Sequence, residues 1–579
     1  MDRRKMHPKN NTKLRFVLFF GVFFSCITPL QHWLFGLTGE ETPFGQARGL
    51  GGLTLDLARP ALQLAAEVPI LHNGVNPFGI NTFLEQEVEP AKRERQVRLI
   101  AKAGFHWVRQ EFPWYDIEIH GKGDFEDRRF EPHRPAWDKY DNIVGLAEKH
   151  QLELIVRLSS PPDWSRAAGN EQGAFAPPDN FDDFADFAEA VAGRYEGRVR
   201  YYQVWNEPNI YPEWGEYPVS PEQYTDLLCR TYRRLKSVDP EIVVLSGALA
   251  PTSELTRRNL NDFIFLQRMY AAGAGQCFDI LSMQGYGLFS GPTDHRRRPI
   301  VINYNRNPYI RDIMVRNGDA GKAIWISEMN WNTAPNGVQD AGAFGQVTEE
   351  QQARYAPLAY QRAQQDWPWI GVINFWFFKR ATGSERDQAF YYFRMAEPDF
   401  TLLPVYRTML EYAHRKHVMY PGYYQENHWA VQWRGEWRTV REGRAVLGSY
   451  REAVGARVTQ QSGVSLVEMA GFSFTWHGTD LILITTHDAP TGSLRISIDG
   501  EPPSPLPPDA GAPLLALASH LPSGEHTAEI LAPDSFAVDG FVVRDAPPVP
   551  VVWLILPLVL LFGIVYRNAR RAAAPRQPE

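Results

Sequence analysis

Short apolar segments alternate with longer amphipathic segments through the middle of the chain, from about residue 74 to residue 415. The apolar segments suit strands buried in a parallel sheet, and each is followed by a segment with apolar residues at helical spacing. The pattern predicts strands at residues 78–83, 106–112, 152–158, 199–205, 242–249, 278–285, 322–331 and 371–378. It predicts helices at residues 90–103, 136–150, 181–195, 221–238, 259–272, 308–317, 348–365 and 404–415.

Eight consecutive strand–helix pairs predict a (β/α)8 barrel over residues 74–415. Strict alternation favours a parallel sheet over a sandwich. A doubly wound open sheet is the structural alternative. No glycine-rich phosphate loop follows the first strand, which favours the barrel.

The pattern changes after about residue 416 to short segments separated by Gly, Pro, Asp and Ser. Leu494, Ile496 and Ile498 alternate with polar residues, as in a half-buried strand. Residues 416–546 are therefore predicted to form a smaller all-β sandwich of jelly-roll type. Such a module either binds sugar or serves as a spacer, and both interpretations remain open.

Both ends of the chain have the pattern of membrane segments. Residues 1–38 comprise a basic tail and then an apolar run from Phe16 to about Leu37. A signal anchor is favoured over a cleaved signal, and a lipoprotein site at Cys26 is a minor alternative. Residues 39–73 are a lead-in without an evident role. Residues 547–567 form a second apolar run before a basic tail at 568–579, so both termini are expected in the cytoplasm and the rest outside it.

Composition excludes some classes of function. The net charge is −7 and the central region has no basic stripe, so nucleic acid is not an expected partner. Cys26, Cys229 and Cys277 lack metal-ligand spacing and are interpreted as buried free thiols. No metal or other cofactor is expected, and the oligomeric state is not predicted. Aromatic residues make up 13% of the chain, an excess that suits core packing and the apolar faces of sugars.

Two glutamates stand where predicted strands end. Glu207 follows the fourth strand and precedes a proline, and Glu328 closes the seventh. The carboxyl ends of barrel strands surround the active site in (β/α)8 enzymes. Glycoside hydrolysis needs two carboxyl groups across the scissile bond, and in a retaining enzyme they are about 5 Å apart. Two unrelated buried glutamates would be costly without a purpose, so the pair is predicted to be catalytic.

The segments Trp205-Asn206-Glu207-Pro208 and Trp325-Ile326-Ser327-Glu328 resemble the catalytic motifs of clan A glycoside hydrolases. Family 39, which includes β-xylosidases, is the most similar in character, with family 5 next. The resemblance implies a retaining barrel enzyme with Glu207 as acid/base and Glu328 as nucleophile. It also implies the following contacts: Asn206 with the sugar 2-hydroxyl, Arg109 and Tyr286 with the nucleophile, and Trp376 beneath the cleaved sugar.

Three further tryptophans follow barrel strands and are candidates for the sugar platform: Trp164, Trp114 and Trp331. Each of these aromatic residues, and Tyr286 and Trp376 as well, could instead be a packing residue, and Arg109 could close a structural ion pair. Three acidic residues in neighbouring loops are interpreted as solvated rim positions: Glu213, Glu216 and Asp387.

The sequence therefore predicts a membrane-anchored retaining O-glycosidase that acts on an extracytoplasmic oligo- or polysaccharide. The competing hypothesis is a non-hydrolytic glycan-binding or assembly protein of an exopolysaccharide system. A third hypothesis has hydrolysis serve polysaccharide synthesis rather than degradation. The sugar, its linkage and the choice between endo and exo cleavage depend on loop shapes that the pattern does not predict.

Overall fold

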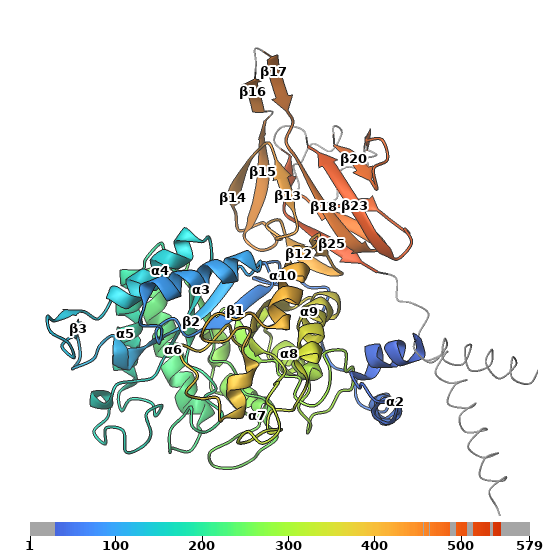
Figure 1. Ribbon diagram of the computed structural model, residues 1–579. Helices are drawn as coiled ribbons and strands as arrows, with labels where there is room; N and C mark the ends of the chain where they lie inside the picture. The colour runs from blue at the N-terminus through green and yellow to red at the C-terminus, as the bar shows by residue number, and fades with distance from the viewer. Residues whose placement is uncertain are drawn as a thin grey trace, which may run out of the picture. The chain divides into compact units, whose positions relative to one another are not determined.

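The computed structural model describes residues 29–455, 457–461, 464–486, 494–505, 513–532 and 536–545. It divides into two compact units (Figure 1). The first is Met1–Lys416 with Tyr423–Trp429, and the second is His417–Gly422 with Ala430–Glu579. Each unit is described by itself.

The first unit contains a parallel eight-stranded sheet in the order β7-β6-β5-β2-β1-β10-β9-β8. Parallel bridges join Leu245 to Ile280 and Leu249 to Met283, and they close the two edges into a barrel. The strands are β1 (Phe78–Thr82), β2 (Trp107–Pro113), β5 (Glu153–Ser159), β6 (Tyr201–Val204), β7 (Val243–Leu245), β8 (Leu281–Gln284), β9 (Ile324–Met329) and β10 (Ile370–Phe375).

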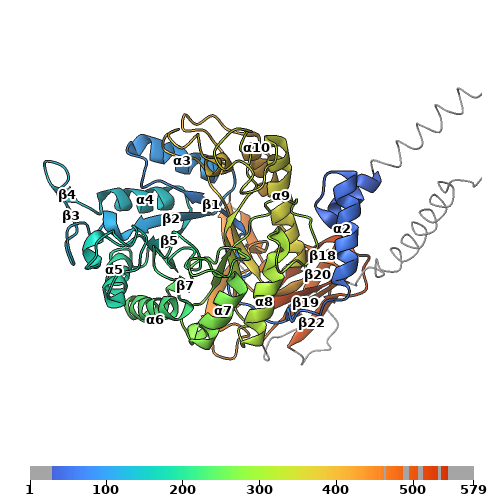
Figure 2. The ribbon, with the colours of Figure 1, turned by 90° about the horizontal axis from the view of Figure 1, so that it is seen from below.

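A helix follows each barrel strand, and these helices surround the strands in Figure 2. Their first residues match helix-start chemistry: Ser220 accepts a hydrogen bond from Gln223 N, and Thr348 and Gln351 form a capping box. The helices are α3 (Pro90–Lys102), α4 (Asp138–Lys149), α5 (Phe181–Arg194), α6 (Pro221–Val238), α7 (Asp262–Ala271), α8 (Asn307–Arg316), α9 (Glu349–Asp366) and α10 (Pro404–Ala413).

The predicted order of eight strands and eight helices is confirmed. Every residue of β1, β6, β7, β8, β9 and β10 is buried, as expected for barrel strands covered on their outer face by helices. The fifth strand is the largest difference, since only Val243–Leu245 is regular where residues 242–249 were predicted. The loops add a short β3–β4 hairpin and 3₁₀ turns: β3 (Glu126–Asp127), β4 (Arg134–Pro135), η1 (Trp114–Asp116), η2 (Asp163–Ser165), η3 (Ala274–Gln276), η4 (Tyr304–Arg306) and η5 (Ala389–Phe393).

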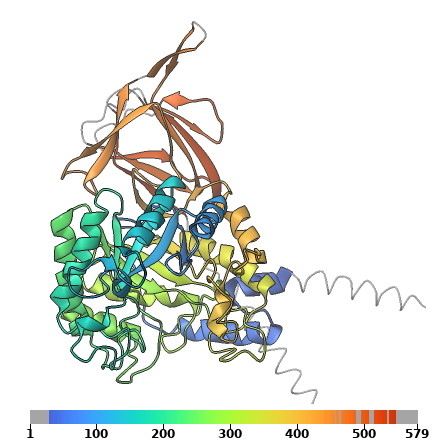
Figure 3. The same cartoon turned by 60° about the vertical axis from the view of Figure 1, so that its left-hand side comes forward.

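The lead-in to the barrel is ordered and packs against it. Residues 29–38 are helical and α2 (Pro43–Asp56) follows. Phe35 stacks on Tyr355 of α9, and Arg354 of α9 pairs with Glu41. Figures 1 and 2 show α2 beside α8 and α9, and the same dark-blue helices lie at the margin of the unit in Figure 3. Residues 39–73 have no evident role in the sequence pattern, whereas the structure makes them part of the first unit.

The predicted membrane helices lie largely outside the residues that the structure describes. Among the residues that it describes, no helix has both the length and the apolar character needed to cross a bilayer. The predicted C-terminal span at 547–567, the tail at 568–579 and residues 1–28 of the N-terminal segment lie outside the described residues. Residues 35–38, which the sequence placed at the end of the first span, contact the barrel loop that follows β8.

The second unit is built of β-sheets. Strand β18 is central to one sheet, pairing with β23, β13 and β11, and β19 pairs with β22 and β25 in another. Phe472 and Phe474 of β18 contact Phe541 of β25, so the two sheets pack through aromatic side chains. A β-sheet domain is confirmed here, and its jelly-roll character stays a prediction. The strands from residue 417 on are β11 (Val418–Met419), β12 (Gly422–Gln425), β13 (Gln432–Arg434), β14 (Glu436–Arg441), β15 (Ser449–Gly455), β16 (Arg457–Gln461), β17 (Val464–Glu468), β18 (Gly471–Gly478), β19 (Asp480–Ile484), β20 (Arg495–Ile498), β21 (Ser504–Pro505), β22 (Leu514–Ala518), β23 (Gly524–Leu531), β24 (Ala537–Val538) and β25 (Gly540–Arg544).

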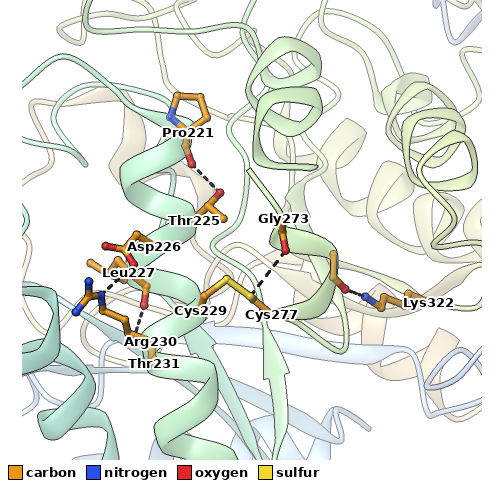
Figure 4. Close-up of a disulfide and its surroundings, with 11 residues drawn as sticks. Pro221, Thr225, Asp226, Leu227, Cys229, Arg230, Thr231, Gly273, Cys277 and Lys322 are labelled. Atoms are coloured by element: carbon orange, nitrogen blue, oxygen red, sulfur yellow. Dashed lines mark hydrogen bonds and ion pairs between the residues drawn. A yellow bond between two sulfur atoms is a disulfide. The ribbon is translucent and has the colours of Figure 1, made fainter. Parts of the chain in front are cut away.

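The interpretation of the cysteines as free thiols is wrong for two of them. Cys229 of α6 and Cys277, just before β8, form a disulfide (Figure 4). The two residues are 48 positions apart in the chain, and their Cα atoms are 4.8 Å apart. The sequence alone could not show this pairing, because the partners come from a helix and from the start of a strand two βα units apart.

Candidate active site

Glu328 is held inside the barrel by two donors on opposite sides of its carboxylate. It lies in β9, whose residues are all buried, and it is 4% exposed. Arg109 Nη1 of β2 donates to Glu328 Oε1 at 3.0 Å. The hydroxyl of Tyr286, just after β8, donates to Oε2 at 2.6 Å. Both contacts that the resemblance implied for Arg109 and Tyr286 are therefore present, and the carboxylate is fixed in orientation.

Each nitrogen of the Arg109 guanidinium donates to at least one acceptor. Its Nη1 also donates to Asn81 Oδ1 at 2.8 Å, its Nε to Gln203 Oε1 at 2.6 Å and its Nη2 to Asn206 Oδ1 at 2.8 Å. The planar fork of an arginine is suited to such simultaneous contacts. Because four acceptors converge on one buried cation, Arg109 has a single orientation relative to Glu328.

Glu207 lies beyond the end of its strand, on a strained backbone. Strand β6 ends at Val204, and both Trp205 and Glu207 have positive φ angles, 75° and 39°. Positive φ in a non-glycine residue costs about 1–3 kcal/mol and persists where surrounding contacts enforce it. Here Glu207 N donates to Ala248 O at 2.9 Å, and the Trp205 indole donates to Glu213 O at 2.8 Å. The turn therefore holds Glu207 at the carboxyl end of the barrel.

The surroundings of Glu207 favour its protonated form. Burial raises the pKa of Glu207 well above the ordinary value, and the negative charges of Glu328 and Glu213 raise it further. A hydrogen bond from Gln284 Nε2 at 3.0 Å and the Arg109 charge act in the opposite direction and lower that pKa. A carboxyl group that stays protonated near neutral pH can donate a proton to a leaving group.

Asn206 contacts both Arg109, which binds Glu328, and Glu213. Its oxygen accepts from Arg109, and its amide donates to the Glu213 carboxyl group. The interpretation of Glu213 as a solvated rim residue is wrong: it is half-buried, and burial raises its pKa to about 7. Its charge interacts with those of Arg157, Glu111 and Glu328. The loop after β6 turns back toward the barrel at Trp214, which is fully buried, and this turn brings Glu213 inward.

The other two acidic loop residues differ from Glu213. Glu216 is half-buried and pairs with Arg258, and Asp387 is exposed, as predicted for a rim. Near Glu213, Glu111 of β2 accepts from the Ser159 and Ser160 hydroxyls at 2.7 Å and pairs with Arg157. The surroundings of the catalytic pair are thus rich in carboxyl groups.

The four candidate tryptophans separate into two kinds. Trp376 and Trp164 are partly exposed at the ends of β10 and β5, so both remain candidates for contact with a sugar. Trp114 and Trp331 are fully buried, and the prediction that they line a sugar platform is wrong. Trp114 stacks on Phe187 of α5, and the Trp331 indole donates to Ser290 O at 2.8 Å. Their rings fill the core behind the loops.

Three residues of the site were not predicted from the sequence: Asn81, Gln203 and Gln284. Each is an amide residue that is at most 2% exposed within a barrel strand whose other residues are mostly apolar. Gln203 also donates to the Ser282 and Ser327 hydroxyls at 2.9 and 3.0 Å. A buried amide needs hydrogen-bond partners, so the polar position in each apolar strand was a signal that could have found them.

A (β/α)8 barrel that brings together one glutamate with a raised pKa and one arginine-bound glutamate, on its fourth and seventh strands, offers the two carboxyl groups that glycoside hydrolysis needs. No protein-family model matches the chain. Among curated proteins, the aryl-phospho-beta-D-glucosidase BglA of Bacillus subtilis (strain 168) is 29% identical over 116 residues. These residues are 20% of this chain and only 23% of that protein, so the match spans less than a quarter of the relative.

The solved structures similar to this chain include glycoside hydrolases. A family 39 glycoside hydrolase from Bacteroides cellulosilyticus WH2 is 18% identical, with 80% of this chain and 83% of that chain covered and a TM-score of 0.46. A monomeric beta-xylosidase from Caulobacter crescentus CB15 is 13% identical, with coverages of 82% and 99% and a TM-score of 0.43. The GH39 enzyme from Xanthomonas axonopodis pv. citri is 14% identical, with coverages of 82% and 96% and a TM-score of 0.42.

Proposed function

We propose that this protein is a retaining O-glycoside hydrolase that acts on an extracytoplasmic oligo- or polysaccharide. The observation that carries the proposal is the contrast between the two glutamates. Glu328 is bound by Arg109 and Tyr286, whereas Glu207 has a raised pKa. One group is thus arranged as a carboxylate nucleophile and the other as a proton donor.

In the first step the Glu328 carboxylate attacks the anomeric carbon, and the bond from that carbon to the leaving oxygen breaks. Glu207 gives its proton to the leaving oxygen, so the aglycone departs as a neutral alcohol. Arg109 and Tyr286 hold the attacking carboxylate in place. Asn206, which contacts Arg109 and Glu213, is proposed to contact the sugar 2-hydroxyl.

In the second step the ionised Glu207 takes a proton from water as the water oxygen attacks the anomeric carbon. The ester bond to Glu328 breaks, and the sugar leaves with its original anomeric configuration. Glu207 is then protonated again, and Glu328 is again a carboxylate. The proton balance closes without a metal or a redox cofactor.

The curated relative is named for a phosphorylated aryl glucoside. For this chain we propose an unphosphorylated sugar, because Glu111 and Glu213 place further negative charge near the catalytic pair. Like charges at close range disfavour an anionic ligand. Comparing kcat/KM for an aryl glucoside with that for its 6-phosphate tests this point, and a preference for the phosphate would contradict it.

The test of the function is trapping of the intermediate by an activated 2-deoxy-2-fluoro glycoside. The expected result is inactivation with one sugar attached to the peptide that contains Glu328, and a product of retained configuration in proton NMR. A non-hydrolytic glycan-binding protein would instead bind oligosaccharide without inactivation or turnover. Labelling at Glu207 or an inverted product would overturn the assignment of roles.

We further propose that the barrel is located outside the cytoplasm, anchored at the cell membrane with both termini inside. The support is the Cys229–Cys277 disulfide, since such bonds persist mainly in oxidising compartments, together with the apolar and basic runs at the two ends of the sequence. Protease treatment of intact cells tests the location. Degradation of the barrel is expected, and complete protection would overturn the proposal.

A further inference from the structure

Large apolar side chains are exposed together on one part of the first unit. Within the described residues, twenty large apolar or aromatic side chains are exposed, and six of them belong to α2, its end and the loop after β8. We call these six the apolar patch: Phe44, Leu55, Leu57, Phe289, Ile300 and Val301. Four of the six are more than two-thirds exposed, at 80%, 71%, 69% and 79% for Phe44, Leu55, Phe289 and Ile300. Concentration of such residues marks an interaction surface.

The two segments of the patch are bound to each other. Gly291 N donates to Gly39 O at 2.7 Å, and His295 N donates to Leu37 O at 3.1 Å. Arg296, which is 2% exposed, pairs with Glu40 at 2.7 Å, and Arg297 N donates to Asp56 Oδ2 at 2.6 Å. A buried ion pair and several main-chain bonds therefore hold α2 and the loop after β8 as one surface.

Helix α2 does not bury its large apolar residues as an ordinary amphipathic helix of a water-soluble domain does. Its buried residues are small or polar, namely Gly45, Gln46, Gly49 and Asp56, whereas Phe44 and Leu55 are exposed and Leu50 and Leu53 are half-buried. A Cβ atom at Gly49 would lie 2.7 Å from the Thr38 side chain, so close packing fixes which face is inward. A helix in water normally buries its apolar face. The exposure of Phe44 and Leu55 therefore points to an apolar partner for this part of α2.

Several ion pairs around the patch have the arginine outermost, although Arg296 is buried against Glu40 and Asp294. In three ion pairs there, the side-chain exposures of arginine and carboxylate are 66% and 13% for Arg48–Glu40, 40% and 9% for Arg59–Asp56, and 27% and 0% for Arg298–Asp294. The outward surface is thus apolar with positive charge beside it. This combination suits a bilayer interface that contains anionic lipids.

We propose that the apolar patch lies on the surface of a lipid bilayer, with its side chains in the headgroup and upper acyl region. A lipid surface is favoured over a protein partner because the residues just before the patch belong to the apolar run at 16–37, preceded by a basic segment. The chain thus reaches the patch directly from a segment that is itself suited to a membrane. The proposal is independent of the hydrolase activity.

The position of the patch has a consequence for the active site. The loop after β8 carries Tyr286, which donates to Glu328, and reaches Phe289 of the patch a few residues later. The catalytic end of the barrel therefore lies beside the surface that we place on the bilayer. Glycans close to the membrane are the substrates that such a position serves.

The test uses the full chain in vesicles of phosphatidylethanolamine and phosphatidylglycerol. Cys26→Ser removes the cysteine outside the disulfide, and a single reporter cysteine is introduced as Leu55→Cys, Ile300→Cys or, as a control, Phe130→Cys. Phe130 is 54% exposed in the loop after β2. Each site carries an environment-sensitive fluorophore, and quenching by nitroxide-labelled lipid is measured. Disulfide content and thermal unfolding of each labelled protein confirm that it is folded.

At least a twofold stronger quenching by the labelled lipid is expected at positions 55 and 300 than at position 130. Equal quenching at all three positions would overturn the proposal. So would shielding of positions 55 and 300 from aqueous iodide without quenching by lipid, since that result would mean that protein covers the patch. Failure of the protein to float with the vesicles would also overturn it.

Discussion

The ends of β6 and β9 each present a glutamate to the same site but surround it differently. Glu328 is part of a regular buried strand, and a cation and a phenol bind its two oxygens. Glu207 stands on a backbone turn of positive φ, accepts a hydrogen bond from an uncharged amide, and is near two other carboxyl groups. The difference shows how one barrel surrounds two identical side chains with different donors and different charges.

The difference also depends on distant parts of the chain. The stabilising cation of Glu328 comes from β2 and its phenol from the loop after β8. The charges that raise the pKa of Glu207 come from β9 and from its own loop. Exchanging the two residues would therefore not exchange their roles, because the surroundings rather than the carboxyl groups decide them.

The largest effect is expected from Glu328→Gln. Loss of the nucleophile removes the covalent pathway, so kcat should fall by more than about 10⁴-fold for every glycoside substrate. The amide keeps the size of the side chain and can still accept from Tyr286. Steady-state rates on aryl glycosides check this, with Glu216→Gln as a control at the rim. A variant that keeps more than a few per cent of wild-type turnover would contradict the assignment.

Glu207→Ala should have an effect that depends on the leaving group. Substrates with a poor leaving group need the proton, and their rate should fall by about 10²–10⁴-fold. Dinitrophenyl glycosides need no proton to cleave the first bond, so their first step should be nearly unchanged. A plot of log kcat/KM against leaving-group pKa should be much steeper than for the wild type. An equal loss for both substrate classes would show that Glu207 is not the acid.

Much of the barrel was predictable because its signals are local. Buried strands and amphipathic helices repeat in the sequence, and Glu207 and Glu328 stand at strand ends that periodicity alone could place. Arg109, Asn206 and Tyr286 were found through the motifs around them. The contacts of Arg109 and Tyr286 with Glu328 agree with the structure, and the contact of Asn206 with a sugar stays a prediction.

The predictions that failed concern long-range contacts or side-chain direction. The polar loop around Glu213 predicts a solvated side chain. Only the inward turn at Trp214 brings Glu213 to the site. Trp114 and Trp331 follow strands as a platform residue should, but whether a ring faces the site or the core depends on side-chain direction. The Cys229–Cys277 pairing depends on how α6 and β8 meet in space. None of these has a periodic signature.

Tyr286→Phe tests the hydrogen bond that the Tyr286 phenol donates to Glu328. It removes a hydrogen bond to a charged group, worth about 1.5–3 kcal/mol, so kcat should fall by about 10- to 150-fold with the fold intact. Tyr304→Phe is the matched control, since Tyr304 is fully buried and donates to Ala359 O away from the two glutamates. It should affect thermal stability and leave kcat within about twofold. Equal kcat losses in both variants would mean that Tyr286 acts only through packing.

The smallest effects are opposite shifts of the pH profile in two variants. These shifts are also the sharpest test of Glu207. Activity requires protonated Glu207 and is lost as pH rises through its pKa. Gln284 lowers that pKa through its hydrogen bond, so Gln284→Leu should move the alkaline limb of kcat to higher pH. The Glu213 charge raises it, so Glu213→Gln should move the limb to lower pH while the acidic plateau stays within about tenfold. A merely structural effect would lower the plateau and shift neither limb. Shifts of the same sign would exclude Glu207 as the group that titrates.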